Sequence, residues 1–234
     1  MLRSHYQEEL GHINEQLVQM SGLAATALER ATRSLMDADL DLAQEVISDD
    51  AYLDAVRRDV DNRAIDMLAR QQPVATDLRQ MVTTLRMSSD LERAGDLARH
   101  VAKLARLRYP SPALDEQLRP IFEEMSTTAI QMVRRAGEIV AASDAHGAAE
   151  LMGADDTMDR LHREVFRILL DPATSMSAQA TVDATLLSRY YERFADHAVS
   201  VALRVVYLVT GVWADEQLPG AHEHFLSDVP RSSG

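Results

Sequence analysis

The sequence is organised around one stretch, Asp90-Leu91-Glu92-Arg93-Ala94-Gly95-Asp96-Leu97-Ala98-Arg99-His100. Glu92 and Asp96 stand four residues apart, a spacing that places both carboxylates on one face of an α-helix, one turn apart. At an offset of 100 residues the pair recurs as Glu192 and Asp196, within a similar local sequence. Because like charges at this spacing repel, their recurrence in a matching context indicates a functional site rather than a solvated helix face.

Apolar residues recur at three- and four-residue steps through most of the chain, which is typical of amphipathic α-helices. Glycine and proline are sparse and stand mostly between these periodic segments, which favours a mainly helical protein. Asp39 and Asp144 are the predicted N-caps of two helices, and Pro73 and Pro120 suit the first turns of two others. The pattern predicts six long helices, caps included, at residues 6–36, 39–70, 73–108, 114–142, 144–170 and 178–210.

The two halves of the chain repeat each other. At an offset of 105, Asp39 matches Asp144 and Asp50 matches Asp155, and the offset falls to 100 in the third helix of each half. A chance similarity would not hold one register and then change it at a predicted loop. We therefore predict an all-α fold of two tandem, pseudo-symmetric three-helix bundles. The predicted bundles are residues 1–108 and 113–213, joined by the linker Tyr109–Pro112, with a flexible tail at 214–234.

Each half also carries a second acidic pair at the same spacing, on its second helix. Antiparallel neighbours in a bundle can bring this pair beside the one on the third helix, so that four carboxylates would converge. Such a concentration of negative charge favours cations, and oxygen ligands prefer Mg²⁺, Mn²⁺, Ca²⁺ or iron to softer metals. The candidate metal ligands are Asp50, Asp54, Glu92 and Asp96 in the first half and Asp155, Asp159, Glu192 and Asp196 in the second.

The predicted sites lie on the surface of the bundles. A helical wheel places Glu92 and Asp96 opposite the apolar stripe of their helix, and so away from the core. His100 and His197 stand near the acidic pairs and could be metal ligands, outer partners of the ligands or ordinary polar residues of a helix face. Neither histidine has a counterpart at the matching position of the other half.

Composition argues against several classes of function. The net charge of −13 argues against nucleic-acid binding, which normally uses a basic face, and is compatible with cation binding. Without cysteine the chain can form neither a disulfide framework nor a thiolate metal site. The N-terminus lacks the apolar run of a signal peptide, and no uncharged apolar stretch reaches the roughly 20 residues of a membrane span. We expect a cytoplasmic protein without membrane insertion.

Two segments of the first half resemble the signature of the PhoU family, regulators tied to the phosphate-specific transport system. They are Leu91-Glu92-Arg93-Ala94-Gly95-Asp96 and, upstream, Gln71-Gln72-Pro73-Val74-Ala75-Thr76-Asp77-Leu78-Arg79. The resemblance covers residues 1–213, and the family's E(D)xxxD motif matches all four acidic pairs. It implies metal clusters, of iron or zinc in some members, on the surface of two three-helix bundles.

The second half departs from the family pattern. It lacks the Gln-Gln-Pro-Val-Ala-Thr-Asp-Leu-Arg segment, and Tyr190-Tyr191 stands where the first half has Asp90-Leu91. The resemblance nevertheless implies a non-enzymatic regulator that damps phosphate uptake and represses the phosphate-starvation response. Its implied partners are the ATPase subunit of the phosphate ABC transporter and the phosphate sensor histidine kinase, and we also expect a homodimer.

Two other interpretations stay open at the level of sequence. A ferritin-like metal store or di-iron carboxylate oxidase would use Glu-x-x-His motifs on inward-facing positions of a four-helix core. The segment Asp159-Arg160-Leu161-His162 is the nearest match, and it has no partner in the first half. The third interpretation is a plain helical scaffold with acidic faces and no metal.

Overall fold

The computed structural model describes residues 2–71 and 76–212, and all regular structure in them is helical. The chain is all-α, as predicted. No helix in the described part is long and apolar enough to cross a bilayer. The six helices are α1 (Leu2–Asp37), α2 (Leu40–Gln71), α3 (Thr76–Arg108), α4 (Arg119–Ala142), α5 (Gly147–Leu169) and α6 (Ala178–Thr210).

Local chemistry sets most helix ends where the sequence predicts them. The Asp39 carboxylate accepts a hydrogen bond from the Leu42 N–H at 3.0 Å, so Asp39 caps α2 as predicted. Gly211 ends α6 in the left-handed conformation, with φ of 78°. The predicted helix start at Pro73 and the predicted flexible tail at 214–234 lie outside the described residues.

Three predicted helix starts are wrong. The first helix begins at Leu2 rather than at Tyr6, and in the other two cases an aspartate forms a turn where a helix start was predicted. The fourth helix begins at Arg119 rather than Leu114, because the Asp115 carboxylate and carbonyl accept from the backbone of the next residues. The fifth helix begins at Gly147 rather than at Asp144. The Asp144 carboxylate accepts from the N–H groups of His146 and Gly147, at 3.1 and 3.0 Å, and so closes a turn before the helix.

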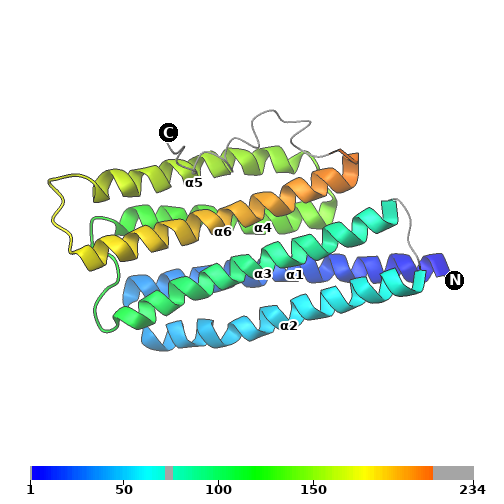
Figure 1. Ribbon diagram of the computed structural model, residues 1–234, viewed down its shortest axis with the longest axis horizontal. Coiled ribbons are helices and arrows are strands. Elements are labelled where there is room, and N and C mark those ends of the chain that lie inside the picture. Colours follow the sequence, from blue (N-terminus) through cyan, green and yellow to red (C-terminus); the bar gives the residue numbers. More distant parts are fainter. Residues whose placement is uncertain (1, 72–75, 213–234) are drawn as a thin grey trace, which may run out of the picture.

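The helices form two groups of three that share one hydrophobic core (Figure 1). Helices α1 to α3 pack against one another, and so do α4 to α6 in the half beside them. The halves meet through α1 against α4 and α3 against α6, whereas α2 and α5 lie on opposite outer sides. The fold is therefore two tandem three-helix bundles, as predicted, with α1, α3, α4 and α6 forming a common centre.

Small residues and hydroxyl groups fill the contact between the halves. A Cβ atom on Gly137 of α4 would lie 2.1 Å from the Ser21 Oγ of α1, so glycine is required for this close approach. Deeper in the core, the Thr32 hydroxyl lies 2.7 Å from the Tyr191 hydroxyl and accepts a bond from Ser126 at 2.9 Å. Because these hydroxyl groups come from α1, α4 and α6, they hold the two halves in one register.

Candidate metal centres

Four carboxylates of the first half lie on the neighbouring helices α2 and α3, and we call them the first acidic cluster. Asp50 and Asp54 come from α2, and Glu92 and Asp96 from α3. Burial raises the pKa of both Asp50 and Glu92, and the charges of Asp54 and Asp96 raise it further, so the four groups lie within electrostatic reach of one another. The structure thus places the four predicted residues on two neighbouring helices.

Gly95, which sequence reasoning missed, leaves space for the Leu53 side chain where α2 packs on α3. It stands between Glu92 and Asp96, and a Cβ atom at this position would lie 2.1 Å from the Leu53 Cδ2 of α2. The same Cβ would be 4.0 Å from an Asp50 carboxylate oxygen. A glycine inside a long helix is a signal of close packing that the sequence did offer.

Two arginines occupy the first acidic cluster. Arg99 Nη1 lies 2.6 Å from Asp50 Oδ2, and Arg99 Nη2 contacts Asp96, so one guanidinium bridges α2 and α3. Arg57 Nη1 lies 3.7 Å from Glu92 Oε1. Arg99 belongs to the stretch that the sequence is organised around, but periodicity alone did not indicate that it turns toward the carboxylates.

Burial leaves these carboxylates incompletely compensated. The Asp50 side chain is 8% exposed, and burial raises its pKa even though Arg99 acts in the opposite direction. Burial also raises the pKa of Glu92, and the neighbouring Asp96 charge raises it further. A raised carboxyl pKa means that the ionised group is less stable here than in water, so an added cation would stabilise the folded chain.

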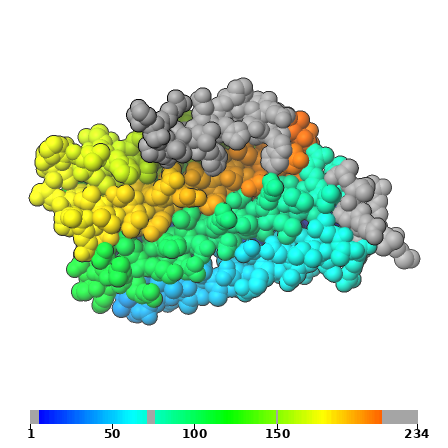
Figure 2. Space-filling model, viewed as in Figure 1, coloured from blue at the N-terminus to red at the C-terminus, as the bar shows by residue number. Residues whose placement is uncertain are grey.

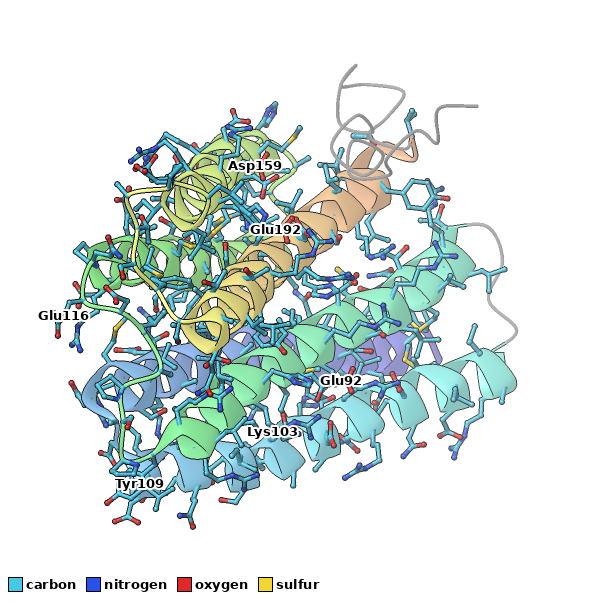
Figure 3. All side chains as sticks on the ribbon, turned by 60° about the vertical axis from the view of Figure 1, so that its left-hand side comes forward. Glu92, Lys103, Tyr109, Glu116, Asp159 and Glu192 are labelled. Carbon is cyan, nitrogen blue, oxygen red and sulfur yellow. The ribbon has the colours of Figure 1, made fainter. Side chains whose placement is uncertain are left out.

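The second acidic cluster repeats the arrangement between α5 and α6. Figure 3 shows Asp159 on α5 and Glu192 on α6, well apart from Glu92 on α3. Burial raises the pKa of Asp196, and the charge of Asp159 contributes in the same direction. Arg189 donates to both carboxylate oxygens of Glu192, at 2.5 and 2.7 Å. Asp155 lies half-buried one turn before Asp159 on α5.

The donor chemistry of both clusters suits a hard cation, but the ligands are not assembled around a single point. In the part of the chain that the structure describes, no three histidine, aspartate or glutamate side chains are grouped so as to hold a metal ion. In the first cluster Arg99 keeps the carboxylates from grouping, because its guanidinium spans the space between Asp50 and Asp96. Metal binding by the four carboxylates would require this guanidinium to withdraw.

The two histidines singled out in the sequence lie in different surroundings. His197 Nδ1 is 3.2 Å from Asp90 Oδ1, and Arg204 Nε donates to Asp90 Oδ2 at 2.8 Å. This buried group joins α3 to α6 across the halves, so His197 contacts Asp90 rather than the predicted ligands. His100 packs on the ring of Tyr190, 5.4 Å between ring centroids.

Asp90 is a charged core residue that sequence reasoning missed. Its burial would raise the pKa of the carboxyl, but the hydrogen bonds and charges of His197 and Arg204 outweigh burial and lower it.

His162, in the segment nearest to a di-iron motif, contacts a hydroxyl group of the next helix. His162 Nδ1 lies 2.8 Å from the Ser188 hydroxyl, between α5 and α6.

The fold and its sites define a class: an all-helical protein of two tandem bundles, each with carboxylates between its second and third helices. The model of the PhoU domain matches residues 17–105 and 122–205, one segment in each bundle. The chain belongs to the PhoU family.

Relatives match along almost the whole chain. This chain is 45% identical to "Phosphate-specific transport system accessory protein PhoU homolog 2" of Mycobacterium tuberculosis, over 91% of its own length and 100% of that protein. It is 42% identical to homolog 1 of Mycobacterium leprae, over 94% of this chain and 100% of that protein. The crystal structure of PhoU from Pseudomonas aeruginosa is similar with a TM-score of 0.80 at 30% identity, covering 88% of this chain and 100% of that chain.

Proposed function

We propose that this chain is an accessory protein of the phosphate-specific transport system that acts as its negative regulator. The proposal rests mainly on the match to two mycobacterial relatives that are named as phosphate-specific transport system accessory proteins. The match covers the full length of both relatives. In this proposal the chain lowers phosphate uptake and represses the phosphate-starvation response when phosphate is plentiful. It acts at the cytoplasmic side by contact with other proteins, without a chemical step of its own.

The partners in this proposal are the ATPase subunit of the phosphate ABC transporter and the phosphate sensor histidine kinase. A second copy of the chain is a further proposed partner, in a homodimer. Long helices with alternating carboxylates and arginines present surfaces of mixed charge, which favour selective docking over non-specific adhesion.

We further propose that the two acidic clusters bind metal ions, with iron or zinc as the first candidates and Mg²⁺ or Mn²⁺ as others. Asp50, Asp54, Glu92 and Asp96 would hold the metal in the first half, and Asp155, Asp159, Glu192 and Asp196 in the second. A bound cation would neutralise carboxylates whose burial disfavours their charge. The chain's own contribution is to hold each set of carboxylates between two rigid helices.

A deletion strain tests the regulatory role. With phosphate plentiful, loss of the gene should leave a phosphate-starvation reporter expressed, and a copy of the gene supplied elsewhere should restore repression. Normal repression in the deletion strain would contradict the proposal.

A folded quadruple variant, Asp50→Asn/Asp54→Asn/Glu92→Gln/Asp96→Asn, then tests whether metal binding is needed for regulation. If metal supports regulation, this variant weakens repression, whereas full repression would make the metal dispensable for it.

A further inference from the structure

A groove of about 540 Å³ lies where the start of α3 meets the end of α6, and we call it the basic groove. Figure 2 shows these two segments side by side at the surface, at one end of the molecule. On α3 the groove residues 78–86 precede the first acidic cluster, which begins at Glu92. It is lined by Leu78, Arg79, Val82, Thr83, Arg86, Tyr207 and Gly211.

Arg79 is held in place at one side of the basic groove. Its guanidinium carbon lies 5.5 Å from the centre of the Tyr207 ring, a cation–π contact. A Cβ atom on Gly211 would lie 2.5 Å from Arg79 Nη1, so the glycine that ends α6 also leaves the space for this side chain. A positioned arginine can bind a carboxylate with less loss of side-chain entropy than a mobile one.

The acidic residues near the groove face other partners. Asp77 lies beside Tyr6 of α1, where burial and the Asp77 charge raise the pKa of the tyrosine to about 12. Asp90, one turn beyond Arg86 on α3, is bound by His197 and Arg204. Among the described residues no carboxylate forms an ion pair with Arg86. The basic groove is therefore a local positive surface on a chain of net charge −13.

The internal repeat shows how this charge arises, because Arg79 and Arg86 stand where the second half has the neutral residues Gln179 and Leu186. At the opposite end of the molecule Asp183 of α6 binds Arg108 of α3 through two hydrogen bonds, at 2.6 and 2.9 Å. At an offset of 100, Thr83 stands where Asp183 stands in the repeat, and Leu208 where Arg108 stands. The positions of that ion pair thus hold uncharged residues at the groove end, and Arg79 and Arg86 line the surface there.

The wall of the groove combines these cations with exposed apolar side chains. Leu78 is 44% exposed and Val82 is 40% exposed, and their spacing of four residues places them on one face of α3. Arg86 continues the same row by a further four residues. Rows of this kind bind an amphipathic helix, whose apolar side chains contact the apolar residues while its acidic side chains pair with the arginines.

We propose that the basic groove is the docking site for an amphipathic helical segment of a partner protein, with acidic and apolar side chains on one face. The inference rests on the proposed function, because it assigns the surface through which contact regulation would act. Charge complementarity selects the occupant: two arginines that form no ion pair with a carboxylate in residues 2–71 and 76–212 favour an acidic segment and disfavour a basic one.

The test compares two full-length variants of equal charge in the deletion strain described above. Arg79→Glu/Arg86→Glu reverses the groove, and Arg33→Glu/Arg106→Glu reverses two exposed arginines elsewhere, on α1 and at the end of α3. Circular dichroism and cellular abundance must show both variants folded. With phosphate plentiful, the groove variant should lose repression and the control should keep it.

A binding measurement tests the same surface in vitro. A synthetic helical peptide of glutamate and leucine should bind the groove variant roughly tenfold more weakly than the parent.

Each outcome decides a separate point. If the deletion strain is derepressed while the folded groove variant represses fully, the inference is wrong and the proposed function stands. Normal repression in the deletion strain would rule out both the groove inference and the proposed function. A groove variant that changes the mass of the protein in light scattering would assign the groove to a second copy of the chain. Peptide binding that requires removal of residues 213–234 would assign it to that segment, and either result overturns the partner proposal.

Discussion

At the scale of single residues, the acidic clusters are places where burial and like charges act against folding. Asp50 and Glu92 both have raised pKa values, for which burial is the main cause. Asp90 is the opposite case, because its contacts with His197 and Arg204 more than offset its burial. The clusters are thus poorly compensated within the chain, whereas the charge that joins the halves is well compensated.

Neutralising Glu92 should stabilise the metal-free protein. A group whose folded pKa is raised contributes stability that is present at acidic pH and lost as pH rises through the folded pKa. Glu92→Gln removes that loss. At pH 7 with a chelator present, the variant should therefore have a free energy of unfolding about 0.5 kcal/mol above the parent's, and a higher melting temperature. The difference should vanish below pH 4, where the parent carboxyl is protonated. A variant less stable than the parent at pH 7 would show that Arg57 compensates this charge fully.

Metal should reverse the order of stability. At a free metal concentration one hundred times Kd, linkage stabilises the folded state by about 2.7 kcal/mol, provided that the ligands are intact. Glu92→Gln/Asp96→Asn should abolish the part of the rise in melting temperature that belongs to the first cluster. Glu192→Gln/Asp196→Asn is the matched variant of the second cluster. Equal metal responses in the parent and both variants would show that neither cluster binds the metal.

At the scale of elements, the packing of α2 on α3 positions the first cluster, and Gly95 makes room for Leu53 in that contact. Leu53 lies where a side chain at position 95 would have to go. The second half has Ala195 at the matching position and Met158 in place of Leu53, and both are buried. The two helix pairs are therefore packed with different side chains, although their carboxylates repeat.

Replacing Gly95 with valine should destabilise the protein by about 1–3 kcal/mol, because the larger side chain overpacks the contact between α2 and α3. Gly22→Ala on α1 is the matched control. No atom lies within 4 Å of a Cβ there, so the change should stabilise its helix by roughly 0.5–1 kcal/mol. Urea unfolding measures both. A Gly95 variant as stable as the parent would mean that Leu53 moves aside at little cost.

At the scale of the whole molecule, the bundles are joined by more than the linker. α1 packs on α4 and α3 on α6, and one core runs through both halves. The proposed division at residues 1–108 and 113–213 therefore separates units of sequence that share a hydrophobic interface. The ion pair of Arg108 with Asp183 and the group around Asp90 add polar contacts to that interface.

Residues 1–108 alone should fold as helices but self-associate. Without α4 and α6, the apolar faces of α1 and α3 are exposed to water, and a second copy can cover them. Circular dichroism should show a helical spectrum with a lower melting temperature than the full chain, and light scattering should show a mass above that of the monomer. A stable monomer would mean that the first half has a sufficient core of its own.

The sequence alone determined the helices, the internal repeat and the eight candidate ligands, because each depends on spacing along one helix or on an offset between copies. It placed α4 and α5 too early because Asp115 and Asp144 can form turns as readily as they can start helices. Only the tertiary structure decided which side chains meet across helices. Arg99 bridges Asp50 and Asp96, Arg204 binds Asp90 from 114 residues away, and the start of α3 joins the end of α6 in the basic groove. Periodicity states which face of a helix is buried, but the partner of that face depends on the packing of the whole chain.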